Sequence, residues 1–291
     1  MSLATTLCHA LSKRLMKAPE VRTADQGAYQ QWREDSLTRS WARFADSGIA
    51  GKDVLDFGCG EGHLGLFIAG KGLARSVVGV EIDLAALAHA RANAAAYSGP
   101  TPVSFLEGGA HGLPVADASV DTILAFDCLE HVMDPAGVVA DWFRVLRPNG
   151  RVLIEWFPFR GPWGPHMEAL IPIPWAHVLF GEKAMFATAA AIYEDPAFVP
   201  RHWDLDETGA KKPNKWTQWQ TFAEQAYVNQ LTLPQFTRIA NRTGFTIDRL
   251  DRKGFGSGAG GLRQRIGDAA MAAPFVGEYF TSHYLIELVR P

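Results

Sequence analysis

Short apolar runs alternate with helical segments through residues 53–155 of this 291-residue chain. Strand-like runs are expected at 53–57, 76–80, 103–107, 122–126 and 151–155. Helical patterns follow the first run at 63–72, the second from Leu84 and the fourth from Gly137. Strands separated by helices in this way pair in a parallel sheet whose two faces are covered by helices. The pattern therefore predicts an α/β fold with a mostly parallel sheet.

The rest of the chain has a different character. Residues 156–230 are rich in Trp, Phe, Pro and His and show no regular period. A helix is expected from Thr232 to Gly244, followed by strands at 245–250 and 282–289. We expect four regions, which are an N-terminal helical cap (1–48), a core (49–156), an insertion (157–230) and a return to the core sheet (231–291).

Composition narrows the class of protein. A content of 47% hydrophobic and 20% charged residues is typical of a chain that buries a sizeable core. A formal net charge of −3 gives no electrostatic reason to expect a nucleic-acid partner. The three cysteines are far apart and form no C-x-x-C, which favours a reducing compartment, the cytoplasm. No apolar run is long enough to span a membrane, so membrane contact is not expected.

The N-terminal stretch MSLATTLCHALSKRLMK is amphipathic and basic, with no acidic residue before Glu20. Two interpretations fit this pattern. One is a transit peptide, and the other, which we favour, is a helix that packs on the domain.

The stretch VLDFGCGEGHLG, at the end of the first expected strand, fits two ligand-binding patterns. Gly60, Gly62 and Gly65 match G-x-G-x-x-G, the fingerprint of dinucleotide-binding enzymes. Asp56 and Gly58 extend the first two of these glycines to D-x-G-x-G-x-G, a loop that holds S-adenosylmethionine. In both cases the glycines let the backbone approach a ligand at the N-terminus of a helix.

Asp56 favours the second pattern. A carboxylate inside the end of the first strand suits a ligand with an ammonium group, as in methionine, and would repel a pyrophosphate. Glu81 ends the second strand, where a carboxylate can accept the hydroxyls of a ribose in either ligand. Only Asp56 therefore discriminates between the two.

Further motifs follow the third expected strand. They are L-P-x-x-D-x-S-x-D (Leu113–Asp121), L-E-H-V (Leu129–Val132), D-P (Asp134–Pro135) and R-V-L-R-P-x-G (Arg144–Gly150). With the glycine loop, this combination resembles the class I S-adenosylmethionine-dependent methyltransferases, in particular the small-molecule branch that includes ubiquinone-biosynthesis-like enzymes. The resemblance covers about residues 50–156. It implies a Rossmann-like seven-stranded sheet, an antiparallel last strand that enters between its neighbours, and an inserted substrate cover at 157–230.

The resemblance also implies a set of contacts to S-adenosylmethionine. These residues are Asp56, Gly58, Gly60, Gly62, Glu81, Ile82, Gly109, Ala110 and Asp127. Asp56 and the backbone of Gly58 would face the methionine end, Gly60 and Gly62 would leave room, Glu81 would bind the ribose and Ile82 would pack on adenine. The family often has an aspartate where Gly109 stands, which leaves the Ala110 N–H to meet an adenine ring nitrogen. Asp127 lies where the backbone usually meets the methionine ammonium.

Methyl transfer from a sulfonium is an in-line displacement, so the protein mainly aligns donor and acceptor and excludes water. A base assists when the acceptor is a hydroxyl. His131 and His166 are the candidates, although His131 can also brace the loop that follows it. His202 is a weaker candidate, and His177 is better explained as a packed side chain.

The aromatic and proline-rich insertion favours an apolar or aromatic small-molecule acceptor, methylated at a hydroxyl oxygen. Methylation of N, C or S, a protein acceptor, a binding protein without turnover, and a surface loop that touches lipid all remain alternatives. No metal is predicted. The acidic residues Glu194, Asp195, Asp204 and Asp206 are expected to be solvated, although a carboxylate pair among them keeps metal assistance open. The sequence carries no signal for an oligomeric state.

Overall fold

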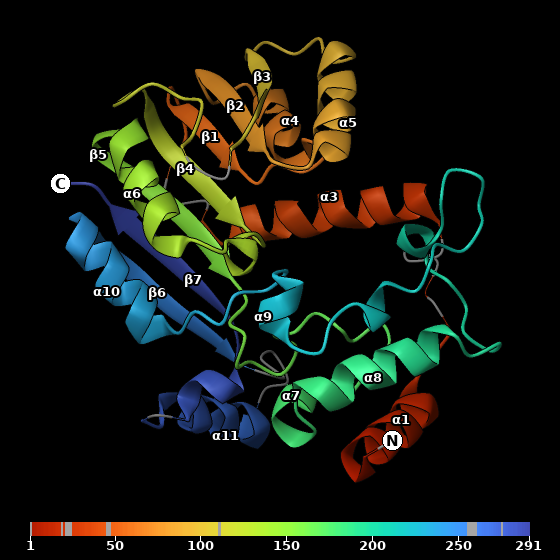
Figure 1. Cartoon of the computed structure of the whole chain (residues 1–291). Coiled ribbons are helices and arrows are strands. Elements are labelled where there is room, and N and C mark those ends of the chain that lie inside the picture. Colours follow the sequence, from red (N-terminus) through yellow and green to blue (C-terminus); the bar gives the residue numbers. More distant parts are fainter. Residues whose placement is uncertain are drawn as a thin grey trace. The chain divides into compact units, whose positions relative to one another are not determined.

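The computed structural model describes residues 2–18, 20, 25–44, 48–109, 112–254, 261–274 and 276–291. The chain divides into two compact units, both drawn in Figure 1. Unit 1 comprises residues 1–32, 158–230 and 254–282, and unit 2 comprises residues 33–157, 231–253 and 283–291.

A seven-stranded sheet forms the core of unit 2. Its strands are β1 (Asp53–Phe57), β2 (Ser76–Glu81), β3 (Val103–Glu107), β4 (Val120–Phe126), β5 (Leu146–Trp156), β6 (Thr246–Gly254) and β7 (Thr281–Val289). The strand order is β3-β2-β1-β4-β5-β7-β6. Strands β1 to β5 pair in parallel, whereas β7 runs antiparallel to β5 and lies between β5 and β6. This confirms the predicted Rossmann-like sheet with its antiparallel last strand.

The helices begin and end at the residues that local chemistry favours. They are α1 (Leu3–Leu15), α3 (Gln26–Ala42), α4 (His63–Gly70), α5 (Leu84–Ala95), α6 (Pro135–Val145), α7 (Ala176–Leu179), α8 (Glu182–Tyr193), α9 (Phe222–Gln225), α10 (Leu233–Thr243) and α11 (Gly261–Ala272). At the start of α6 the Asp134 carboxylate accepts the Gly137 N–H, and Pro135 occupies the first turn. Gly244 ends α10 with a left-handed φ of 106°.

Helices cover both faces of the sheet. Successive side chains of a strand point to opposite faces, so neighbouring residues of one strand contact different helices. In β4, Ile123 belongs to the same core cluster as Trp142 of α6 and Phe236 of α10. Its neighbour Leu124 belongs to another cluster, with Ile68 of α4. The helices therefore lie on both faces, as the alternation of strands and helices predicts.

Unit 1 contains the regular helix α8 within residues 156–230, where the sequence shows no regular period. The stretch EKAMFATAAAIY is rich in alanine, the best helix former, and buries Phe186 and Ile192. The N-terminal helix α1 packs on α8, as our favoured interpretation of the N-terminus predicts, and the two lie side by side in Figure 1. Among the described helices, none combines the length and hydropathy that a bilayer span requires.

Candidate functional site

The carboxyl ends of β1, β2, β3 and β4 share one edge of the sheet, because these strands are parallel. This edge gathers the predicted residues Asp56, Gly58, Gly60, Gly62, Glu81, Ile82, Gly109, Asp127 and His131. Ligands of open parallel sheets bind outside such an edge. Two predicted residues are not part of this set: Ala110 lies outside the described residues, and His166 belongs to unit 1.

The backbone of the loop after β1 is left-handed at three glycines. Gly58, Gly60 and Gly62 have φ values of 68°, 53° and 83°. A Cβ on Gly58 would lie 3.0 Å from the Cβ of Cys128, and a Cβ on Gly62 would lie 2.6 Å from the Phe105 ring. A Cβ on Gly60 would meet no atom within 4 Å. Packing therefore requires glycine at 58 and 62, whereas Gly60 borders open space.

Asp56 is a buried carboxylate with one strong backbone contact. It is 3% exposed, and its Oδ2 accepts the Gly65 N–H of α4 at 3.0 Å. Burial, which disfavours the charged form, raises the pKa of Asp56 to about 7, and the charge of Glu81 adds to this effect. A cationic ligand group beside Asp56 would stabilise its ionised form.

Glu81 connects the glycine loop to the end of β2. Its Oε2 accepts the Gly60 N–H at 2.8 Å, and its Oε1 accepts the N–H groups of Ile82 and Asp83 at 2.7 and 2.9 Å. A carboxylate offers about four acceptor positions. The hydroxyls of a bound ribose would therefore share Glu81 with these backbone groups. The Ile82 side chain is 70% exposed, as a surface for a flat ring would be.

Arg33 of α3 is a site residue that the sequence analysis missed. Its guanidinium forms an ion pair with the carboxylate of Asp127, which follows β4 with a φ of 54°. The charge of Arg33 also opposes the rise in the pKa of Asp56. Because 94 residues separate Arg33 from Asp127 in sequence, no local pattern could indicate the pair.

Two buried carboxyl groups and one half-buried histidine also lie at this edge. Burial, together with the Asp127 carboxylate, raises the pKa of Glu130 well above its usual range. Glu155 of β5 pairs with Arg43, yet burial still raises its pKa. Burial lowers the pKa of His283 to about 4, so this histidine is neutral at pH 7. The carboxyl groups of Asp56, Glu130 and Glu155 therefore hold their protons more readily than exposed carboxyl groups do.

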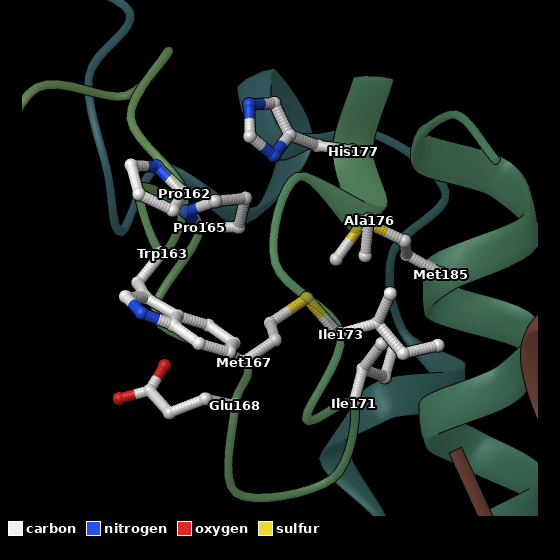
Figure 2. A pocket seen from close by; sticks show the side chains of 10 residues that line it. All are labelled: Pro162, Trp163, Pro165, Met167, Glu168, Ile171, Ile173, Ala176, His177 and Met185. Atoms are coloured by element: carbon white, nitrogen blue, oxygen red, sulfur yellow. The ribbon is translucent and has the colours of Figure 1, made fainter. Parts of the chain in front are cut away.

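Unit 1 holds the other candidate base and an apolar hollow. His166 is half-buried with a φ of 55°, and its N–H donates to the Trp163 carbonyl at 2.9 Å. The hollow, drawn in Figure 2, is shallow: the space of about 190 Å³ between its walls includes solvent at its open mouth, and its enclosed part holds about one water molecule. It is lined by Pro162, Trp163, Pro165, Met167, Glu168, Ile171, Ile173, Ala176, His177 and Met185. Its chemistry suits an apolar group.

The remaining candidates are engaged locally. The His177 ring packs on Phe159 with centroids 5.1 Å apart, and burial lowers its pKa to about 4. Asp195 pairs with Lys13 at 2.6 Å, and Asp204 accepts the Arg201 N–H at 3.0 Å. Asp206 accepts backbone N–H groups of its own turn. Each of these three carboxylates therefore has a structural partner, and Asp204 is buried, so the prediction that it is solvated is wrong.

Residues 55–154, which include most of β1, all of β2 to β4 and most of β5, match the family model described as a methyltransferase domain. Over about a third of its length, therefore, the chain is similar to a methyltransferase domain. Its glycine loop, Glu81 and Asp127 lie within the matched residues, and Asp56 is the second residue of the match.

Proteins that are similar to this chain are named as methyltransferases. A "probable S-adenosylmethionine-dependent methyltransferase" of Mycolicibacterium smegmatis is 43% identical over 106 residues, which are 36% of this chain and 38% of the relative. An "uncharacterized methyltransferase" of Mycobacterium ulcerans is 33% identical over 144 residues, 50% of this chain and 52% of the relative. The chain therefore spans between about a third and a half of the length of these relatives.

Solved structures agree on the fold. The cyclase SpnF aligns with a TM-score of 0.52 at 16% identity, over 90% of this chain and 83% of its own. A protein of Listeria monocytogenes, named as an S-adenosylmethionine-dependent methyltransferase, aligns with a TM-score of 0.50 at 13% identity, over 87% of this chain and 98% of its own. A cyclase shares the architecture, so function has to be argued from the site.

Proposed function

We propose that the protein transfers a methyl group from S-adenosylmethionine to a small, hydrophobic or aromatic acceptor, at a hydroxyl oxygen. The observation that carries the proposal is Asp56, a buried carboxylate at the carboxyl end of β1, within the residues that are similar to a methyltransferase domain. A dinucleotide would bring a pyrophosphate to this position, where the carboxylate of Asp56 would repel it.

The donor groups of this edge fit S-adenosylmethionine part by part. Asp56 would pair with the ammonium group of the methionine moiety, and Arg33 would offer a guanidinium to its carboxylate. Glu81 would accept the ribose hydroxyls, and the exposed Ile82 would pack on the adenine. Gly109 and Ala110 would offer backbone groups to the same ring. The Arg33–Asp127 ion pair would then be shared with the ligand.

The cofactor supplies the methyl group on a sulfonium. The residues of this chain would orient the acceptor, exclude water from it and remove the proton of its hydroxyl group. Alignment of donor and acceptor in a site without water is the largest contribution expected of the protein. His131 after β4, or His166 in unit 1, would accept the proton of an acceptor hydroxyl.

The acceptor class is inferred from unit 1. The hollow beside Trp163 is lined by methionine, isoleucine and proline side chains, which favour an apolar or aromatic group over a charged one. We assign residues 157–230 as the substrate cover, residues 1–48 as a helical cap, and residues 49–156 and 231–291 as the cofactor-binding core. Three free, buried thiols fit a reducing compartment, so we place the protein in the cytoplasm.

Calorimetry with S-adenosylhomocysteine and with NAD tests the cofactor. We expect micromolar binding of S-adenosylhomocysteine and none of NAD, and the reverse result would refute the proposal. Glu81→Gln should weaken binding by about 10- to 100-fold, because one oxygen that accepts hydrogen bonds becomes a donor.

Mass spectrometry of products, after incubation with S-adenosylmethionine and a panel of hydrophobic phenols and alcohols, tests the reaction. Methylated product from a hydroxyl acceptor is expected. Product only from amine, thiol or protein acceptors would move the assignment to another atom. Tight cofactor binding without any product would indicate a binding protein.

A further inference from the structure

Helix α1 has the reverse of the usual arrangement of side chains. It buries Thr5, Cys8 and Ser12, and the Thr5 carbonyl accepts a hydrogen bond from the Thr188 hydroxyl of α8 at 3.4 Å. Its leucines lie outside. Leu3, Leu7, Leu11 and Leu15 are 77%, 49%, 42% and 48% exposed, and we call these four residues the leucine ridge. The ridge runs the length of the helix, since every fourth residue returns to nearly the same side.

Water disfavours this arrangement. Removing a leucine side chain from water is favourable, so four exposed leucines leave most of this gain unrealised. Helices that contact each other through small residues and hydroxyls, with large apolar residues outward, are typical of an apolar surrounding medium. Thr5 and Ser12 on α1, and Ala184 and Thr188 on α8, are small buried residues of this kind. The outer face of α1 is therefore suited to an apolar medium.

The charge of the N-terminal segment indicates which apolar medium would contact α1. The first 18 residues carry Lys13, Arg14 and Lys17 and no acidic residue, although the whole chain has a net charge of −3. Lys13 is paired with Asp195, whereas Arg14 and Lys17 are exposed. Basic residues beside an exposed apolar face match anionic lipid headgroups above an apolar interior. Contact between the α1 helices of two copies would instead bring like charges together, because α1 has no acidic residue of its own.

Two further helices of unit 1 carry exposed apolar pairs. Val178 and Leu179 of α7 are 54% and 63% exposed. Leu262 and Ile266 of α11, four residues apart, are 72% and 61% exposed. These pairs add to the apolar surface that unit 1 exposes.

We propose that α1 is an interfacial helix that docks unit 1 on the surface of an anionic lipid bilayer. Such a helix lies in the plane of the interface, with its apolar side among the upper acyl chains, and does not cross the membrane. The expectation of no membrane contact rests on the lack of a spanning run and does not concern this mode of binding. The proposal is independent of the methyltransferase activity.

Flotation of the full chain with vesicles tests the docking. We expect binding to vesicles of phosphatidylglycerol and phosphatidylcholine, weak binding to pure phosphatidylcholine, and release at high salt. The double variant Leu7→Ser/Leu11→Ser should lower the vesicle-bound fraction by tenfold or more. The matched control Leu73→Ser/Leu250→Ser removes leucines of comparable exposure, 53% and 39%, from unit 2 and should bind as the unmodified protein does.

A second pair of variants isolates the charge. Arg14→Glu/Lys17→Glu should release the protein from anionic vesicles at physiological salt, whereas Arg238→Glu/Arg242→Glu on α10 should not. Circular dichroism confirms that each variant is folded, and light scattering reports its mass.

Three results would overturn the proposal. The first is no flotation of the unmodified protein with anionic vesicles, and the second is equal loss in the control variants. The third is a dimer that Leu7→Ser/Leu11→Ser converts to a monomer without vesicle binding, which would make a second copy the occupant. None of these results depends on cofactor binding or turnover.

Discussion

Helices α6 and α1 show how differently the two units use a helix. In unit 2, α6 buries Val139, Trp142 and Val145 against the sheet, which is the arrangement that water favours. In unit 1, α1 buries small and hydroxyl-bearing residues and exposes its leucines. The sequence predicts both helices, yet only the first presents the face that hydrophobic periodicity predicts. The surroundings of a helix, rather than its composition, decide which face is buried.

The two units also differ in the side chains that they gather, which are ionisable in unit 2 and apolar in unit 1. Unit 2 gathers Asp56, Glu130 and Glu155 at the carboxyl edge of its sheet, where burial raises the pKa of each carboxyl group. Unit 1 offers an apolar hollow beside Trp163. If cofactor binding and acceptor binding are divided in this way, changes in one unit should leave the function of the other intact.

The largest expected effect contrasts the two helices directly. Trp142→Ala should lower the free energy of unfolding by about 3–5 kcal/mol, because it removes a fully buried indole from the core. Leu11→Ala should change it by no more than about 0.5 kcal/mol in water, since the side chain is exposed and alanine favours the helix. Urea denaturation of both variants without lipid provides the measurement. Similar losses would mean that the leucine ridge is covered in solution.

Loss of the Asp56 charge should weaken cofactor binding by about 100-fold or more. Hydrogen bonds to a charged group are worth about 1.5–3 kcal/mol, and the ion pair with the ligand adds to them. Asp56→Asn keeps the shape of the side chain and removes its charge, and calorimetry with S-adenosylhomocysteine measures the loss. Asp83→Asn is the matched control, because asparagine also caps α5 well and Asp83 is exposed. An unchanged affinity in Asp56→Asn would place the ammonium group elsewhere.

In unit 1, His166→Asn should lower turnover by about 100-fold if His166 is the base, while the affinity for S-adenosylhomocysteine stays within a few-fold. Asparagine is chosen because it tolerates the left-handed φ of 55° at this position. Trp163→Ala should also lower turnover at constant cofactor affinity. His89→Ala, an exposed histidine on α5, should change neither quantity. If both unit 1 variants keep full turnover, acceptor alignment does not reside in residues 157–230.

The smallest expected effect is a pH dependence. The pKa of Asp56 is about 7 in the folded protein, so its ionised form is about tenfold less populated at pH 6 than at pH 8. The apparent affinity for a cationic ligand group should fall by the same factor. Because this pKa is raised above the unfolded value, the folded protein holds the proton more tightly. The group therefore lowers the free energy of unfolding as the pH rises from about 4 to 7.

Asp56→Asn provides the control for both pH profiles. Its weaker cofactor affinity should not vary across this range, and its melting temperature should fall less between pH 5 and pH 8 than that of the unmodified protein. Parallel melting profiles would show that another buried carboxyl group, such as Glu130, is responsible.

The sequence alone determined the sheet, the glycine loop and the carboxylates at the strand ends. These features follow from short-range rules, namely apolar runs of strand length, left-handed positions that need glycine, and residues that directly follow a strand. Such rules are sufficient to place Asp56, Glu81 and Asp127 at one edge of the sheet. They are not sufficient for α8 of unit 1, because prolines and aromatic residues around this helix conceal its alanine-rich pattern.

Only the tertiary structure decided which distant residues meet. The Arg33–Asp127 and Arg43–Glu155 ion pairs join α3 and the turn after it to the strand ends across 94 and 112 residues, and no local pattern encodes such a contact. The raised pKa of Asp56 likewise results from burial by elements that are far from it in sequence. The outward orientation of the leucines on α1 was also decided by its packing on α8, because a periodic pattern predicts that a helix forms but not which medium its apolar side faces.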